Sequence, residues 1–110
     1  MPQENSMTFN VFIKAEAYED AVTAFLYYEE KQQGLGEKFL NSLHNKYSDI
    51  SLHPYNYSFI DEDPLKVLRD VRLRSFPYVI VFEIVNMDVI VYAVHHLKRN
   101  PLRKLHSKGK

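Results

Sequence analysis

The sequence predicts an α+β fold: a small antiparallel sheet of about four strands with an N-terminal helical hairpin packed on one face. Apolar residues recur at spacings of three and four between residues 15 and 52, which is the helical period. Runs rich in β-branched and aromatic residues follow between residues 67 and 96. The predicted order is β-α-α-β-β-β, and a chain of 110 residues has room for one domain, spanning residues 1–110.

The N-terminal half supplies a short strand and the two helices. Residues 8–13 alternate between apolar and polar side chains, as a strand does. A helix is expected from residue 15 to about residue 33, where Gly34-Leu35-Gly36 ends it. A second helix, from residue 37 to about residue 52, stops before Pro54. The short glycine-containing connection predicts that the helices are antiparallel.

Three further strands are expected in the C-terminal half. Residues 67–74 alternate between a mostly apolar and a basic face, and residues 78–85 are almost continuously β-branched or aromatic. A polar break at residues 86–88 predicts a hairpin turn before the last strand, residues 89–96. Residues 55–63 are expected to form a loop or an edge strand.

The charge of the chain is divided between its halves, although the net charge is zero. Residues 1–63 carry four Lys and Arg against eleven Asp and Glu, which gives −7, and residues 64–110 carry ten against three, which gives +7. The absence of cysteine excludes disulfides, thiolate nucleophiles and cysteine metal sites, and no metal or cofactor is expected. No apolar stretch approaches 18 residues and no basic-then-apolar leader opens the sequence, so we expect a cytoplasmic protein without membrane contact. Residues 1–7 and 103–110 are expected to be flexible ends.

Basic residues gather at the tips of two predicted strands. If neighbouring strands pair as consecutive hairpins, one neighbourhood contains Arg72, Arg74, His95 or His96, Lys98 and Arg99. Such a cationic surface is suited to a phosphate backbone or an acidic peptide. Arg72 and Arg74 have a second interpretation, a solvated strand face or ion pairs with the acidic helices.

The two histidines alternate across the last strand, so one of them must face inward. In strict alternation His95 shares a face with Val91 and Ala93, and His96 lies on the other face. For either histidine alone, a structural role is favoured over a catalytic one. Arg69, on the apolar face of its strand, is expected to pair with a helix carboxylate.

Several segments in order carry a family resemblance: Tyr27-Tyr28-Glu29, residues 34–40, residues 72–80 and residues 95–101. The chain resembles the RelE/ParE superfamily of bacterial toxins from type II toxin-antitoxin modules over roughly residues 8–102. The resemblance implies a growth-inhibiting toxin, of the kind linked to plasmid stabilisation, that a cognate antitoxin neutralises in a hetero-oligomer. RelE-like members cut messenger RNA within the ribosome, and ParE-like members block DNA gyrase.

The resemblance transfers only part of the RelE-like cleavage site. Arg72 matches a basic strand position and Arg99 the arginine after the last strand, whereas Asp70, Val79 and Leu105 stand where other side chains are expected. His106 is adjacent to the last of these. As a metal-independent endoribonuclease the chain would rely on Arg72, Arg99 and His96. As a binding protein it would use Arg72, Arg74, Tyr78, His95, Lys98 and Arg99, and this ParE-like interpretation is favoured.

Three functions therefore remain open from the sequence. The first is a toxin that binds DNA gyrase, and the second is a ribosome-dependent messenger RNA endoribonuclease. The third is a non-toxic, degenerate member retained for antitoxin binding and operon autoregulation.

Overall fold

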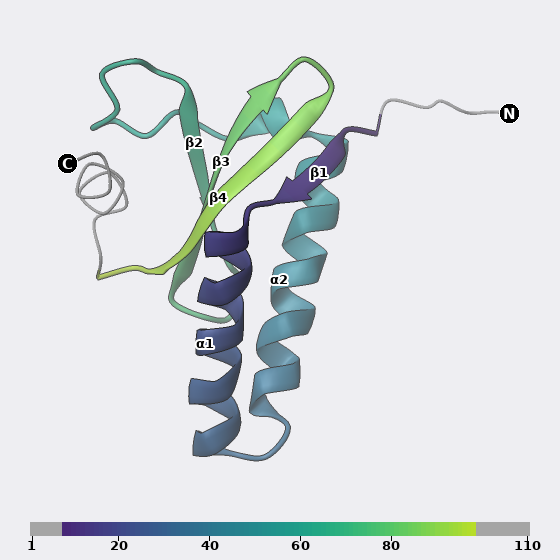
Figure 1. Ribbon diagram of the computed structural model, residues 1–110, viewed down its shortest axis with the longest axis vertical. Coiled ribbons are helices and arrows are strands. Elements are labelled where there is room, and N and C mark those ends of the chain that lie inside the picture. The colour runs from purple at the N-terminus through teal and green to yellow at the C-terminus, as the bar shows by residue number, and fades with distance from the viewer. Residues whose placement is uncertain (1–7, 99–110) are drawn as a thin grey trace, which may run out of the picture.

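A computed structural model of the chain describes residues 8–98. In chain order its elements are β1 (Asn10–Ile13), α1 (Ala15–Lys31), α2 (Leu35–Leu52), a short 3-10 helix (Pro54–Asn56), β2 (Leu68–Arg72), β3 (Tyr78–Val85) and β4 (Asp88–His96). The predicted α+β class is confirmed, because the paired helices pack on one face of a four-stranded sheet (Figure 1). The expected flexible ends, residues 1–7 and 103–110, lie outside the described residues.

The sheet has the strand order β1-β4-β3-β2. Antiparallel pairing joins β2 to β3 and β3 to β4, but β1 runs parallel to β4, with Val11 opposite Val89. The sheet is therefore mixed, which corrects the expected all-antiparallel pairing. The helical hairpin returns the chain to the end of the sheet where β1 began, so β2 and, after two further reversals, β4 run in the direction of β1 (Figure 1).

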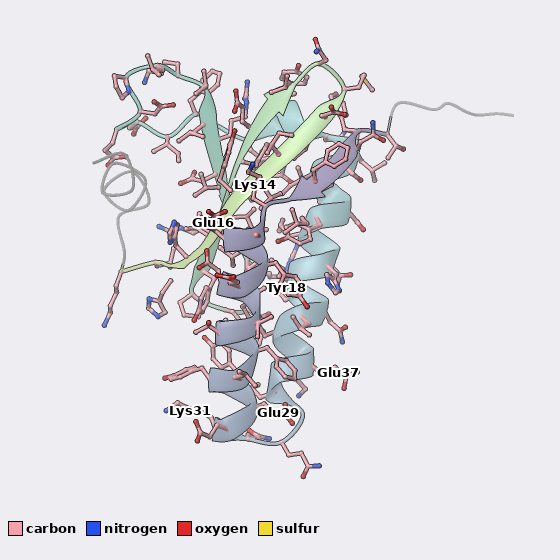
Figure 2. All side chains as sticks on the ribbon, viewed as in Figure 1. Lys14, Glu16, Tyr18, Glu29, Lys31 and Glu37 are labelled. Carbon is pink, nitrogen blue, oxygen red and sulfur yellow. The ribbon has the colours of Figure 1, made fainter. Side chains whose placement is uncertain are left out.

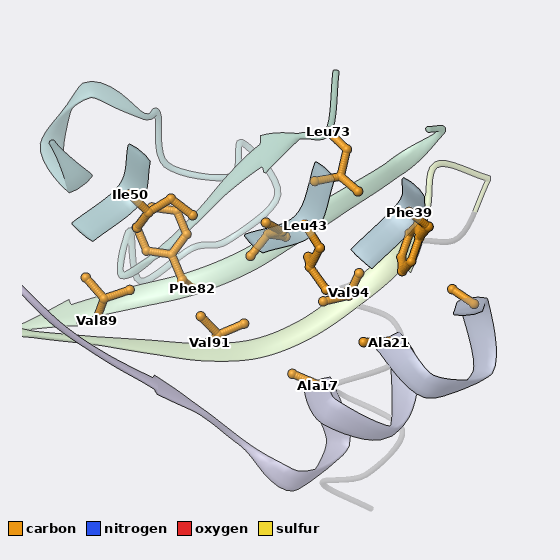
Figure 3. Packing of buried hydrophobic residues seen from close by; sticks show 12 residues of the cluster. Ala17, Ala21, Phe39, Leu43, Ile50, Leu73, Phe82, Val89, Val91 and Val94 are labelled. Carbon is orange, nitrogen blue, oxygen red and sulfur yellow. The ribbon is translucent and has the colours of Figure 1, made fainter. Parts of the chain in front are cut away.

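The main core lies between the helices and the sheet. Alanines on α1 allow close approach, while α2 and the strands supply the large side chains (Figure 3). Burial of each large aliphatic or aromatic side chain contributes about 1.5–3 kcal/mol. The central members of the cluster are Ala17, Ala21, Phe39, Leu43, Ile50, Phe82, Val89 and Val91.

The turn between the helices is held by one carboxylate. Glu29, near the end of α1, accepts hydrogen bonds of 3.0 Å from the backbone N–H groups of both Gly34 and Gly36, at the start of α2 (Figure 2). A negative charge at this end also complements the α2 dipole. Gly34 has φ +90°, and a Cβ on Gly36 would lie 2.8 Å from the carbonyl oxygen of Phe25. Both glycines are thus required by geometry.

β4 contains a β-bulge near its middle. Val81 of β3 pairs with Ala93, whereas its neighbour Phe82 pairs with Val91, so Tyr92 is the extra residue. An extra residue interrupts the two-residue alternation of side chains, and the residues after it exchange faces.

The bulge decides the orientation of the two histidines. Val94 packs in the core beneath the helices with Val91, while Ala93 packs on the face away from the helices, called the open face below. The predicted alternation, which placed Val91, Ala93 and His95 on one face, is therefore wrong beyond Val91. His95 belongs to the open face and His96 to the helix side.

A loop between the 3-10 helix and β2 covers part of the open face. Ile60 packs there with Val81 and Ala93, and an isolated bridge joins Phe59 to Arg69 of β2. The expectation of a loop or edge strand in this region is confirmed by that bridge.

Candidate binding surfaces

Arg72, Val79 and His95 occupy one row across β2, β3 and β4 on the open face. The register pairs Arg72 with Val79 and Val79 with His95. Two strand spacings, about 10 Å, therefore separate the backbones of Arg72 and His95. Arg72 is exposed, whereas His95 is completely buried. In this row, solvent reaches the charged side chain of Arg72 but not the imidazole of His95.

Carboxylates accompany Arg72 on the open face. Asp70 lies two residues before Arg72 on the same face of β2. The pKa of Asp70 is raised above its ordinary value, mainly by burial and secondly by the negative charge of Glu62. Glu83 on β3 accepts a 2.7 Å hydrogen bond from the Tyr92 hydroxyl. Burial, together with that bond, raises the pKa of Tyr92 to about 12. Negative charge beside Arg72 makes this face a poor surface for a phosphate backbone.

A hollow that we call the sheet-end groove lies beside α1, where β3 begins and β4 ends. Its volume is about 640 Å³. Its aromatic and basic lining consists of Tyr27, Tyr28 and Lys31 of α1, Tyr78 of β3, His96 of β4 and Lys98. Three predicted functional residues, Tyr78, His96 and Lys98, are thus brought together.

Aromatic rings form a continuous series along the sheet-end groove. Ring centroids are 5.1 Å apart for Tyr27 and Tyr28, 6.1 Å for Tyr28 and Tyr78, and 5.3 Å for Tyr78 and His96. All three contacts are edge-to-face, a favourable geometry for aromatic pairs. The Lys31 ammonium lies 4.9 Å from the Tyr27 ring centroid.

The backbone after β4 fixes the other side of this groove. Leu97 donates a 2.8 Å hydrogen bond from its N–H to the Pro77 carbonyl, and the Lys98 N–H donates one of 3.2 Å to Nδ1 of His96. Lys98 and Lys31 line this groove and add positive charge to its aromatic walls. Such a site can hold an acidic segment that also carries apolar or planar groups.

Sequence reasoning missed the contribution of α1 to this groove. The available signal was the spacing of four residues that places Thr23, Tyr27 and Lys31 on one helix face. Tyr27 is 51% exposed.

The predicted single cationic neighbourhood is divided in the structure. Leu73 is buried after β2, and the chain then carries Arg74 toward α2, where it lines a separate polar hollow. Arg72 stays on the open face, and Tyr78 and His96 lie on the helix side. Arg99 lies outside the described residues, as do Leu105 and His106.

An apolar hollow of about 280 Å³, the inter-helix groove, lies between α1 and α2 next to Ile13. On the α1 side Tyr18, labelled in Figure 2, is 66% exposed, and Val22 is 38% exposed. Leu40 and Tyr47 line the groove from α2. Burial, followed by the nearby Asp20, raises the pKa of Tyr47 above its ordinary value.

The helices within residues 8–98 are too short or too polar to cross a membrane. In the same part of the chain, no group of three or more His, Asp or Glu side chains is arranged to hold a metal ion.

Comparison with known proteins identifies the family. Residues 11–101 match the family model of the ParE toxin of the type II toxin-antitoxin system, parDE. Because this match covers most of the sequence, the chain belongs to the ParE toxin family of type II toxin-antitoxin systems. No sequence among the curated proteins matches the chain.

Solved structures support the fold. A chain of the chromosomal ParDE toxin-antitoxin system from P. aeruginosa is similar with a TM-score of 0.62 and 14% identity, over 83% of this chain and 98% of that one. A chain of the RelBE2 toxin-antitoxin complex from Mycobacterium tuberculosis is similar with a TM-score of 0.59 and 14% identity, over 86% and 97%. At this identity the likeness establishes a shared RelE/ParE fold.

Proposed function

We propose that this toxin arrests growth by binding DNA gyrase and that a cognate antitoxin neutralises it in a hetero-oligomer. The observation that carries the proposal is that Arg72 and His96, the two predicted catalytic residues within residues 8–98, lie on opposite faces of the sheet. An aromatic groove suited to binding lies on the His96 side. The family match to a ParE toxin supports the same choice.

Metal-free cleavage of RNA needs a base, an acid and cations around one phosphate. Arg72 and His96 lie on opposite faces of the sheet, and the histidine on the Arg72 face, His95, is buried. Asp70 and Glu83 add negative charge to that face. The described residues therefore favour inhibition by binding over cleavage.

The sheet-end groove is the proposed contact with the target. Exposed aromatic residues at the centre of an interface often dominate its binding energy, and Tyr27 is half exposed at the groove wall. Lys31 and Lys98 favour an acidic segment of the partner and would increase its association rate.

The inter-helix groove is the proposed contact with the antitoxin. Tyr18 and Val22 expose apolar surface one helical turn apart, which fits the apolar face of an amphipathic helix. Glu19 lies beside Tyr18 on α1 and favours a basic flank on that helix. The two solved structures described above come from toxin-antitoxin systems, which supports an antitoxin partner for this chain.

Induction in cells tests the proposal, with plasmid supercoiling and primer extension on messenger RNA measured in parallel. We expect growth arrest, relaxed plasmids and intact transcripts. Tyr27→Ala, an exposed change in the groove, should weaken the arrest by about tenfold or more in effective dose. Lys98→Gln should weaken it less, and Lys14→Gln, which removes the same charge outside the groove, should have no effect.

The other outcomes identify the alternatives. Supercoiled plasmids with transcripts cut at translated codons would replace the proposal with ribosome-dependent RNA cleavage. Harmless induction with retained antitoxin binding would show a degenerate, non-toxic member.

A further inference from the structure

Arg74 does not join either the open face or the sheet-end groove, and it lines a third hollow of about 400 Å³. This hollow, the α2 pocket, lies between the outer face of α2 and the turn from β2 to β3. Side chains with nitrogen or hydroxyl donors line it, among them Lys38, Asn41, Asn45, Lys46, Arg74 and Ser75.

The positions of these side chains follow from the core. α2 buries Phe39, Leu43 and Ile50 toward the sheet, so the polar residues between them share the outer side of the helix. Lys38 and Lys46 are eight residues apart, which places their backbones about 12 Å apart along the helix axis.

The turn that carries Arg74 and Ser75 is anchored at both ends. Leu73 is 5% exposed and its N–H donates a 2.9 Å hydrogen bond to the Tyr78 carbonyl. On the other side of the turn, Phe76 makes an edge-to-face contact with Phe39, with centroids 5.4 Å apart. The backbone of Arg74 is thus held in place next to α2.

Charge in the α2 pocket is only partly neutralised. Lys46, whose side chain is 16% exposed, makes a 3.7 Å ion pair with Asp49. The side chains of Lys38 and Arg74 form no ion pair or hydrogen bond with any other residue of the described part of the chain. Three cations against one carboxylate leave the pocket with a net charge of +2, in a chain whose net charge is zero.

We propose that the α2 pocket binds the phosphodiester backbone of a nucleic acid. Phosphate oxygens in protein complexes are contacted by Arg and Lys together with Ser, Thr and Asn side chains, and this pocket presents that set. Arg74 supplies a planar guanidinium that can donate two hydrogen bonds to one phosphate, and Lys38 and Lys46 supply point charges along α2. Such contacts position a backbone without reading its sequence. This binding is separate from the proposed contact with gyrase.

Fluorescence anisotropy tests the site directly. The full chain is titrated against a labelled duplex DNA and a labelled single-stranded RNA, each about 20 nucleotides long, between about 50 and 200 mM salt. We expect binding that is insensitive to sequence and weakens with salt. Lys38→Gln and Arg74→Gln should each weaken binding and each reduce the log–log salt slope by about 0.9 for duplex DNA or about 0.7 for single strands.

The matched control is Lys14→Gln, which removes one exposed charge from the start of α1 and should leave the slope of the wild-type chain. Melting curves establish that each variant is folded. The two probes decide between DNA and RNA as the natural backbone. Absence of binding, or equal slopes for the Lys38, Arg74 and Lys14 variants, would overturn the proposal. The assay contains no gyrase, so its outcome is independent of the proposed cellular target.

Discussion

Replacement of Asp63 with alanine should destabilise the loop that covers the open face of the sheet. Asp63 is 4% exposed, and its carboxylate accepts backbone hydrogen bonds of 3.1 Å from Leu65, 2.9 Å from Val67 and 2.9 Å from Leu68. These bonds close the turn around Lys66, which has φ +56° although it is not a glycine. The alanine variant loses all three bonds and the support for that strained residue.

The size of the effect follows from the number of bonds and their charge. A hydrogen bond to a charged group contributes about 1.5–3 kcal/mol, and water recovers part of the loss in a surface loop. We therefore expect a loss of about 2–4 kcal/mol in the free energy of unfolding. For a domain of this size that corresponds to a fall of about 8–16 °C in melting temperature.

Chemical denaturation at neutral pH measures this loss, with Asp61→Ala as the control because Asp61 is exposed in the same loop. We expect a change below about 0.5 kcal/mol for the control. Equal stability of the Asp63 variant and the wild-type chain would refute the role given to the carboxylate.

The pH dependence has a defined sign. Backbone hydrogen bonds, the largest from Leu68, lower the pKa of Asp63 below its ordinary value of 3.8. The stabilisation is thus complete above that ordinary value and is lost as the pH falls through the lower folded-state pKa. Asp63→Ala should remove this part of the acid sensitivity, so the wild-type and variant stabilities should converge at low pH. Parallel curves would contradict the assignment.

Two further changes test the packing of the helices. Gly36→Ala adds a Cβ about 2.8 Å from the Phe25 carbonyl oxygen. The overlap should outweigh the better helix propensity of alanine, so we expect a net loss of about 1–2 kcal/mol in the free energy of unfolding. A denaturation midpoint equal to that of Ser48→Ala, an exposed change on α2, would show that the helices adjust. Asp20→Ala removes the carboxylate that accepts a 3.0 Å hydrogen bond from the Val94 N–H. Val94 lies in the part of β4 that extends past its pairing with β1. Amide hydrogen exchange at Val94 should accelerate, and unchanged protection would show that the bond is not needed.

Periodicity predicted the elements because each amphipathic segment buries one continuous face. The strand over residues 78–85 has the predicted bounds, and both helices agree within about two residues at each end. The two-residue turn at Asn86 and Met87 was also within the predicted break, and φ +56° at Asn86 matches the turn chemistry of a tight hairpin.

Features that depend on contacts between distant segments were not predictable in this way. The bulge at Tyr92 arises from pairing with β3, and no local signal in the sequence marks it. Arg69 was expected to pair with a helix carboxylate, but its guanidinium donates a 2.6 Å hydrogen bond to the Tyr57 carbonyl and lies 4.0 Å from the Phe59 ring centroid. The loop supplied partners that a strand pattern does not reveal.

The same limit applies to the site. Sequence order placed Arg72 and Arg74 on one strand face, but β2 ends at Arg72 and the buried Leu73 redirects the chain. The predicted binding set contained Tyr78 and His95, but the structure places His96, not His95, opposite Tyr78. The extra residue Tyr92 shifts the pairing by one position, and the turn alone does not reveal that shift. The helix residues that complete the sheet-end groove come from an element far away in sequence.

Inhibition of gyrase is tested most directly with purified DNA gyrase, relaxed plasmid and increasing amounts of the chain. We expect a dose-dependent loss of negative supercoiling. Addition of the cognate antitoxin should restore supercoiling, and the Tyr27→Ala variant should inhibit it less. Full supercoiling activity at every dose of a folded, growth-arresting sample would contradict the proposal.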